Sequence, residues 1–216
     1  EHFGACQVNL DWVIETLQEI VAAGADVINL PNTVERSRPV VFAEMVEKVV
    51  AALPRQVVVS VHCHNDLGMA TATTVESYFR GARQLEVTLN GLGERAGNTN
   101  LYEAAVALSL NGVSIELDLK QIYGIALKVS RLTAEPISPK APIIGQECLY
   151  HRSGIHQHGA NRTFQRAQKA YLPFDPAMVG RAGDEELRFT SQSGYTAVLA
   201  IVQEAGRIIS EAEARL

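Results

Sequence analysis

This sequence has few cysteines, no long apolar run and no excess of basic charge, and each of these features excludes a class of protein. The three cysteines, at positions 6, 63 and 148, are too few and too scattered for a disulfide framework, which predicts a reducing, cytoplasmic location. No apolar run approaches the ~18 residues of a membrane span. The 19 Lys and Arg residues are scattered among 24 acidic ones, for a net charge of −5, so neither nucleic acid nor a membrane is an expected partner.

Several catalytic signatures are lacking too. There is no G-x-S-x-G, H-E-x-x-H, C-x-x-C or EF-hand loop, so nucleophilic serine or cysteine catalysis has no support. The first residue is Glu1 rather than Met, and no basic or apolar leader follows it, which predicts an internal start and no signal peptide.

What the first half does contain is a repeat of short apolar strands and amphipathic helices. Strand centres near Ile28, Val59 and Val87 are spaced by about 30 residues, as in parallel βα units. Such units build either a (β/α) barrel or an open doubly wound sheet. The predicted strands are 26–30, where Pro31 ends the strand, 56–61 and 85–89, and the predicted helices are 9–25, 39–53, 69–82 and 100–110.

The pattern changes after Gly112. A helix is predicted over 117–134, a proline-rich linker over 136–153, a short helix over 154–169 and helix-rich sequence from 193 to the end. We therefore predict two domains: residues 1–135, the C-terminal part of a TIM barrel of the α/β class, and residues 136–216, a linker and a mostly helical subdomain.

His62 and His64 are the sharpest local feature. Side chains two apart on a strand point to the same face, so both imidazoles converge as two metal ligands would. The alternative is a pair of hydrogen-bonded polar residues at a strand end. Asn65 and Asp66 follow, and one of them can orient an imidazole while the other caps the next helix. Cys63 between the histidines points to the opposite face and is expected to be a core residue.

Two further segments carry polar groups at exposed turns. Residues 90–98 hold three glycines, a Glu94–Arg95 pair and Asn98, which either caps the next helix or offers its amide oxygen to a metal. Their spacing fits neither a dinucleotide fingerprint nor a P-loop. In residues 153–159, His156 and His158 point different ways on a helix, so we expect no second metal pair; His156 is either a solvent-facing residue or a general acid or base.

Five segments together resemble one family. The chain is similar to 2-isopropylmalate synthases, whose barrels are related to HMG-CoA lyase, and the likeness spans nearly all of it. The segments that carry the likeness are residues 30–34 (LPNTV), 60–68 (SVHCHNDLG), 90–98 (NGLGERAGN), 153–157 (SGIHQ) and 171–176 (YLPFDP).

This resemblance implies an acyltransferase of leucine biosynthesis that condenses acetyl-CoA with 2-oxoisovalerate to give 2-isopropylmalate. It implies a divalent cation, Mn, Mg or Zn, that binds the keto acid and polarises its carbonyl. The likeness implies a homodimer in which helical-subdomain residues reach a neighbouring copy. The implied metal ligands are His62, His64 and Asn98, the implied carboxylate contact is Thr33, and the implied proton-transfer residues are His156 and Tyr171.

Some features depart from the family pattern. Its aspartate ligand on the first barrel strand has no counterpart here, and Asn32, Glu35 and His158 replace residues that are commonly Asp, Gly and Asp. The missing aspartate and the short barrel predict a C-terminal fragment that is inactive in isolation or needs to pair with another copy. The open alternatives are citramalate or homocitrate synthase, with another 2-keto acid as acceptor, and a non-catalytic oligomerisation module.

Overall fold

The computed structural model describes residues 1–164, 171–183, 186–187 and 194–215. The chain divides into two compact units, Glu1–Leu117 and Asp118–Leu216, which are described separately. The unit boundary precedes the helix that the sequence analysis assigned to the barrel part. The predicted division into domains 1–135 and 136–216 stays a prediction.

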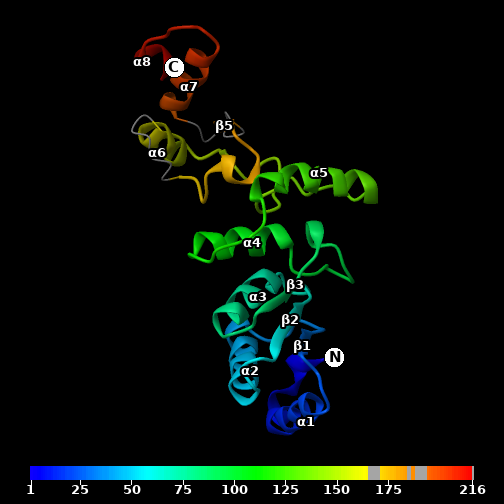
Figure 1. Ribbon diagram of the computed structural model, residues 1–216. Helices are drawn as coiled ribbons and strands as arrows, with labels where there is room; N and C mark the ends of the chain where they lie inside the picture. Colours follow the sequence, from blue (N-terminus) through cyan, green and yellow to red (C-terminus); the bar gives the residue numbers. More distant parts are fainter. Residues whose placement is uncertain (165–170, 184–185, 188–193, 216) are drawn as a thin grey trace. The chain divides into compact units, whose positions relative to one another are not determined.

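The first unit is built around a three-stranded parallel sheet, ordered β1-β2-β3, with helices between the strands (Figure 1). This is the predicted βα repeat, and it forms part of an α/β barrel. The elements are η1 (Phe3–Asn9), α1 (Leu10–Ala22), β1 (Val27–Asn32), α2 (Pro39–Ala52), β2 (Val58–Cys63), α3 (Ala70–Phe79), β3 (Gln84–Glu86), η2 (Leu89–Gly91) and α4 (Leu101–Leu110).

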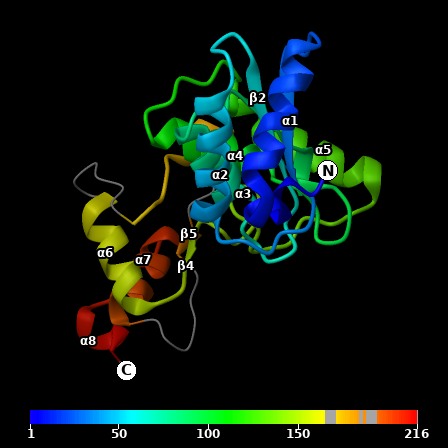
Figure 2. The same ribbon diagram turned by 90° about the horizontal axis from the view of Figure 1, so that it is seen from below.

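The two faces of this sheet differ in chemistry. Val59, Val61 and Cys63 of β2 point into an apolar core, in which they join residues of α1, α2 and α3. Ser60 and His62 alternate with them and point to the other face. Figure 2 shows α1, α2 and α3 gathered close to one another around this sheet. One face of the sheet is therefore available for polar groups.

Strand β1 runs through Pro31 to Asn32, so the prediction that Pro31 ends the strand was wrong. Pro31 pairs with His62 in the parallel register between β1 and β2. A proline has no N–H for a ladder bond, and Pro31 is the last residue but one of β1.

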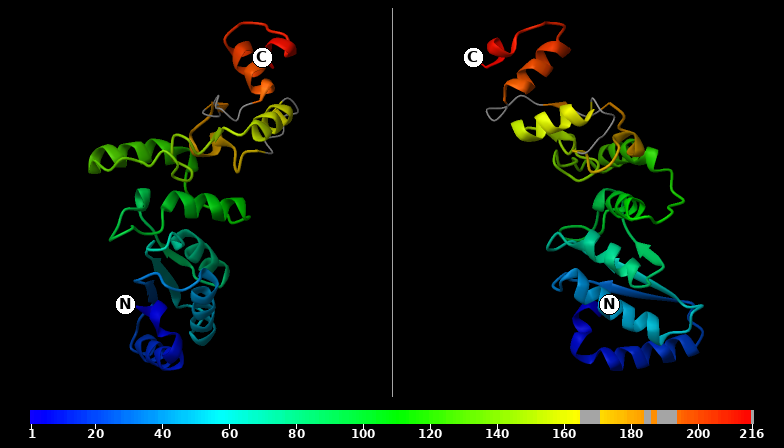
Figure 3. Two further views of the ribbon diagram at one scale, coloured as in Figure 1. Left: turned by 180° about the vertical axis from the view of Figure 1, so that it is seen from behind. Right: turned by 90° about the vertical axis from the view of Figure 1, so that its left-hand side faces the viewer.

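The second unit is mostly helical. Figure 3 shows α6 and α7, which contact one another. Its elements are η3 (Leu119–Gln121), α5 (Ile122–Thr133), β4 (Tyr150–His151), α6 (Gly154–Phe164), η4 (Pro176–Val179), β5 (Glu186–Leu187), α7 (Tyr195–Glu204) and α8 (Glu211–Ala214). Residues 165–169, the end of the helix predicted over 154–169, lie outside the described residues.

The proline-rich segment before α6 is held by an arginine. Arg181 is 3% exposed and donates hydrogen bonds to the carbonyl oxygens of Ile143 (3.1 Å) and Gly145 (2.8 Å). Its guanidinium also lies 4.6 Å from the centre of the Tyr123 ring. The loop and α5 are thereby joined.

Among the described helices, none combines the length and the apolar character needed to cross a membrane.

Phe42 tests the importance of the apolar core. Its side chain is fully buried on α2, and its ring meets that of Phe3 edge-to-face, with centroids 5.7 Å apart. We expect Phe42→Ala to lower the free energy of unfolding by about 3–5 kcal/mol in urea titrations, because it leaves a cavity. Phe79→Ala is the matched control, since Phe79 is 52% exposed; equal losses in the two variants would contradict this assignment of the core.

Candidate functional site

The imidazoles of His62 and His64 lie together at the carboxyl end of β2. Their ring centroids are 4.9 Å apart and their planes are nearly perpendicular, at 88°. The period-2 prediction that both rings share one face therefore fits the structure. Burial, and then the neighbouring His62, lower the pKa of His64 below its usual value, which favours the neutral imidazole that binds cations.

Cys63 lies between them in sequence but in the core, as expected. The side chain is fully buried, and burial raises the pKa of its thiol to about 12.

Asn98 reaches this place from the loop after β3. It forms an isolated antiparallel bridge with His64, and its N–H donates to the carbonyl oxygen of Gly91 (3.0 Å). It does not cap α4, because Asn100 takes that role by accepting a hydrogen bond from the N–H of Tyr102 (3.0 Å).

The loop needs its glycines for this approach. A Cβ on Gly93 would lie 2.6 Å from the side-chain amide of Asn98, and Gly97 has a positive φ of 92° with no room for a Cβ beside the carbonyl oxygen of Gly91. Glycine is the residue that permits both features. The glycine spacing thus places the Asn98 amide close to the strand ends.

Three side chains here carry buried polar atoms without a hydrogen-bond partner in the structure: Nδ1 of His62, Nδ1 of His64 and Oδ1 of Asn98. Buried polar atoms are almost always paired, so such a group of orphans calls for a ligand or solvent. Among the described residues, no three His, Cys, Asp or Glu side chains gather as a metal cluster. The donor set at this site is therefore two imidazoles and one amide oxygen.

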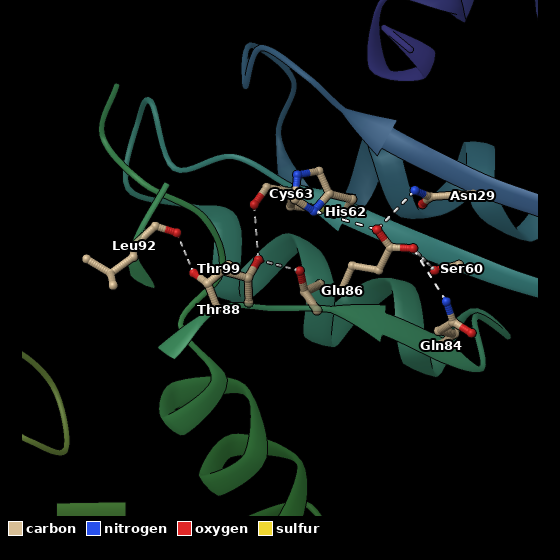
Figure 4. Close-up of polar contacts among 10 residues, drawn as sticks. Asn29, Ser60, His62, Cys63, Gln84, Glu86, Thr88, Leu92 and Thr99 are labelled. Atoms are coloured by element: carbon tan, nitrogen blue, oxygen red, sulfur yellow. Dashed lines mark hydrogen bonds and ion pairs between the residues drawn. The ribbon is translucent and has the colours of Figure 1, made fainter. Parts of the chain in front are cut away.

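Glu86 of β3 lies beside His62, as Figure 4 shows. Its carboxylate accepts hydrogen bonds from Asn29 (3.1 Å), Ser60 (3.0 Å) and Gln84 (3.4 Å), and its Oε2 lies 4.0 Å from Nδ1 of His62. The sequence analysis missed this residue. The signal was its place in the third strand, on the same face as the histidines.

An arginine ties together the loops that follow the three strands. Arg95 donates two hydrogen bonds to the carboxylate of Asp66 (2.7 and 2.9 Å) and one to the carbonyl oxygen of Thr33 (2.7 Å). The hydrogen bond from Arg95, followed by that from the N–H of Glu35, lowers the pKa of Asp66 to about 2. Thr33, His64 and Asn98 therefore belong to loops that this fork joins.

Glu35 also joins the loops that follow β1 and β2. It is 1% exposed, and its carboxylate accepts hydrogen bonds from the N–H groups of Leu67 (2.7 Å) and Met69 (3.2 Å) at the start of α3. Negative charge at this end of a helix is favourable. The sequence analysis treated Glu35 only as a departure from the family pattern and missed its role in holding the loop.

Thr33 lines a small pocket. Its hydroxyl accepts a hydrogen bond from the N–H of His2 (2.9 Å), and the pocket of about 100 Å³ is completed by Gly4, Ala5, Val34 and Arg36. Two basic side chains at its rim suit an anionic group. Thr33 is linked to the loops of the two imidazoles by the hydrogen bond that Arg95 donates to its carbonyl oxygen.

His156 and Tyr171 form a second group, within the second unit. Their ring centroids are 5.7 Å apart, and His151 lies on Tyr171 as well, at 6.3 Å. Burial, and then His156, lower the pKa of His151. The ring of Tyr171 occupies the space beside Gly159, where a Cβ would collide with it. The sequence analysis paired His156 with Tyr171 but missed His151.

Comparison with known proteins defines the class. The HMGL-like family profile matches residues 4–129, more than half of the chain. An HMG-CoA lyase from Pseudomonas aeruginosa has the same fold, with a TM-score of 0.54 and 18% identity over 60% of this chain and 45% of that one. The chain therefore belongs to the HMGL-like family.

Within that family the resemblance is to 2-isopropylmalate synthases, as the motifs predicted. The chain is 53% identical to 2-isopropylmalate synthase 2 of Leptospira interrogans, over 99% of this chain and 50% of that protein. It is 35% identical to the 2-isopropylmalate synthase of Acetivibrio thermocellus, over 96% and 41%. Residues 147–203 match the alpha-isopropylmalate synthase post-catalytic domain-like profile. The chain thus spans half or less of these relatives.

Arg95 is open to a direct test. We expect Arg95→Gln to speed amide hydrogen exchange at Glu35 and Asn98 roughly tenfold, because the bond between the loops is lost. Arg80→Gln is the control, since Arg80 pairs with Glu47 (2.6 Å) and Glu76 (3.4 Å) on helix surfaces. If the amides of Glu35 and Asn98 exchanged at the same rate in both variants, the hydrogen bonds of Arg95 would not stabilise these loops.

Proposed function

We propose that this chain is part of an acyltransferase that condenses acetyl-CoA with 2-oxoisovalerate to give 2-isopropylmalate. One observation carries the proposal: the imidazoles of His62 and His64 lie 4.9 Å apart at the carboxyl end of the sheet, and Asn98 forms a bridge with His64 there, where barrel enzymes hold their reactive groups. The identity to named 2-isopropylmalate synthases supports the choice of reaction.

The residues at this place fit a divalent cation. Imidazole nitrogens and an amide oxygen suit Mn, Mg and Zn to different degrees, and an orphaned amide oxygen accepts a cation as readily as a donor. When bound there, such an ion supplies Lewis-acid polarisation of the keto-acid carbonyl. His62, His64 and Asn98 are the residues that would hold it.

The remaining roles belong to this chain's other groups. The Thr33 hydroxyl is proposed to bind the keto-acid carboxylate, in a pocket that His2 and Arg36 also line. His156 and Tyr171 are proposed to move protons to and from the reacting carbon and the new hydroxyl in the site of a neighbouring copy, which requires a homodimer. Glu94 and Arg95 organise the glycine loop.

Metal titration tests the ligand set. We expect the unmutated chain to bind Mn²⁺ or Zn²⁺ in isothermal titration, and His62→Ala or His64→Ala to weaken binding at least tenfold, because each removes one of few ligands. Gly93→Ala should also weaken binding, since its Cβ displaces the Asn98 amide.

His158→Ala is the matched control, because His158 is an exposed histidine of the second unit. Absence of any binding by the unmutated chain would favour a non-catalytic oligomerisation module instead.

The 216-residue chain itself should be inactive. The candidate site holds two imidazoles and an amide. Among the described residues, no third His, Cys, Asp or Glu side chain joins the two histidines in a metal-binding cluster. We expect no release of CoA thiol from acetyl-CoA and 2-oxoisovalerate by the isolated chain; robust turnover would contradict this.

A full-length relative carrying this sequence in place of its own segment identifies the acceptor. 2-Oxoisovalerate should give the highest kcat/KM in a panel with pyruvate and 2-oxoglutarate. Preference for pyruvate would indicate a citramalate synthase, and preference for 2-oxoglutarate a homocitrate synthase.

A further inference from the structure

Glu86 has no part in the function proposed above, yet the strand register places it next to a metal-ligand candidate. In the β2–β3 pairing, His62 is the direct partner of Glu86, and Ser60 is the partner of Gln84. Partners in a parallel sheet point to the same face. The backbone register therefore sets Glu86 and His62 side by side on one face of the sheet.

The carboxylate is held by three neighbouring side chains. Oε1 accepts hydrogen bonds from Ser60 and Gln84, and Oε2 accepts one from Asn29, as Figure 4 shows. A carboxylate oxygen accepts two hydrogen bonds, so Oε2 has one acceptor position left. That oxygen is the one 4.0 Å from Nδ1 of His62.

Nδ1 of His62 is the atom that needs a partner. It is buried and makes no hydrogen bond in the described structure. A neutral imidazole carries its proton on one nitrogen and a lone pair on the other, and a hydrogen bond at one nitrogen decides which. A small rotation of either side chain closes 4.0 Å to a hydrogen bond of ~2.9 Å.

We propose that Glu86 is a positioning residue that accepts the Nδ1 proton of His62 and so leaves the Nε2 lone pair of His62 for the cation. Histidines that bind metals generally donate their other N–H to a carboxylate or carbonyl in this way, which fixes both tautomer and ring orientation. The inference deepens the proposed function and rests on its metal site.

The tautomer is measured first, on the metal-free chain. Long-range ¹H–¹⁵N correlation spectra at neutral pH, with the His62 signals assigned by their loss in His62→Asn, should show the proton on Nδ1. In Glu86→Gln the fraction with the proton on Nδ1 should fall, because an uncharged amide is a weaker acceptor. A proton on Nε2 in the unmutated chain would overturn the proposal, and this readout needs no variant of Glu86 to fold.

Metal affinity is measured second, by titration with Zn²⁺ alone. Glu86→Gln should weaken binding ~10–100-fold, while its unfolding midpoint in urea stays near that of the unmutated chain. Glu47→Gln is the matched control, since Glu47 is an exposed carboxylate paired with Arg80. Equal Zn²⁺ affinity in Glu86→Gln and the unmutated chain would also overturn the proposal. Absence of condensation activity in the full-length relative carrying this sequence, together with the Nδ1 tautomer and Zn²⁺ binding through His62, would refute the proposed function and leave Glu86 its role.

Discussion

The parallel register between β2 and its two neighbours is the constraint on which the rest of the first unit depends. It sets Asn29, Ser60 and Gln84 in one row across the sheet, and Pro31, His62 and Glu86 in the next. A slip of one residue would turn the imidazoles toward α2 and α3 and expose the core residues of β2. The apolar packing that stabilises this unit therefore also aims its polar groups, and the two cannot be changed separately.

The ends of those strands are joined by charges rather than by apolar contacts. The Arg95 fork on Asp66 and the buried Glu35 carboxylate join segments 29 and 32 residues apart in sequence, and the bond from Arg95 to the Thr33 carbonyl joins segments 62 residues apart. Bidentate and charge-assisted bonds are stronger than single neutral ones. These bonds join the loops that carry Thr33, His64 and Asn98.

Much of this arrangement was predictable from local sequence patterns. The spacing of the strands gave the parallel βα units, and the period of two gave the shared face of His62 and His64. The roles of Glu35 and Glu86 were not predictable in the same way, because their partners are far away in sequence and meet them only through folding. Pro31 misled because a proline usually signals the end of a strand, whereas β1 continues for one more residue, to Asn32.

The close approach of the Asn98 amide to Gly93 also limits how this sequence can drift. Every single-base change in a glycine codon that alters the amino acid introduces a side chain with at least a Cβ, and at position 93 that atom would fall 2.6 Å from the amide. A single-base change at this codon therefore cannot give another residue that lacks a Cβ. Variation in descendants of this gene is thus expected to spare position 93 and to be tolerated at Gly124, where a Cβ meets nothing within 4 Å.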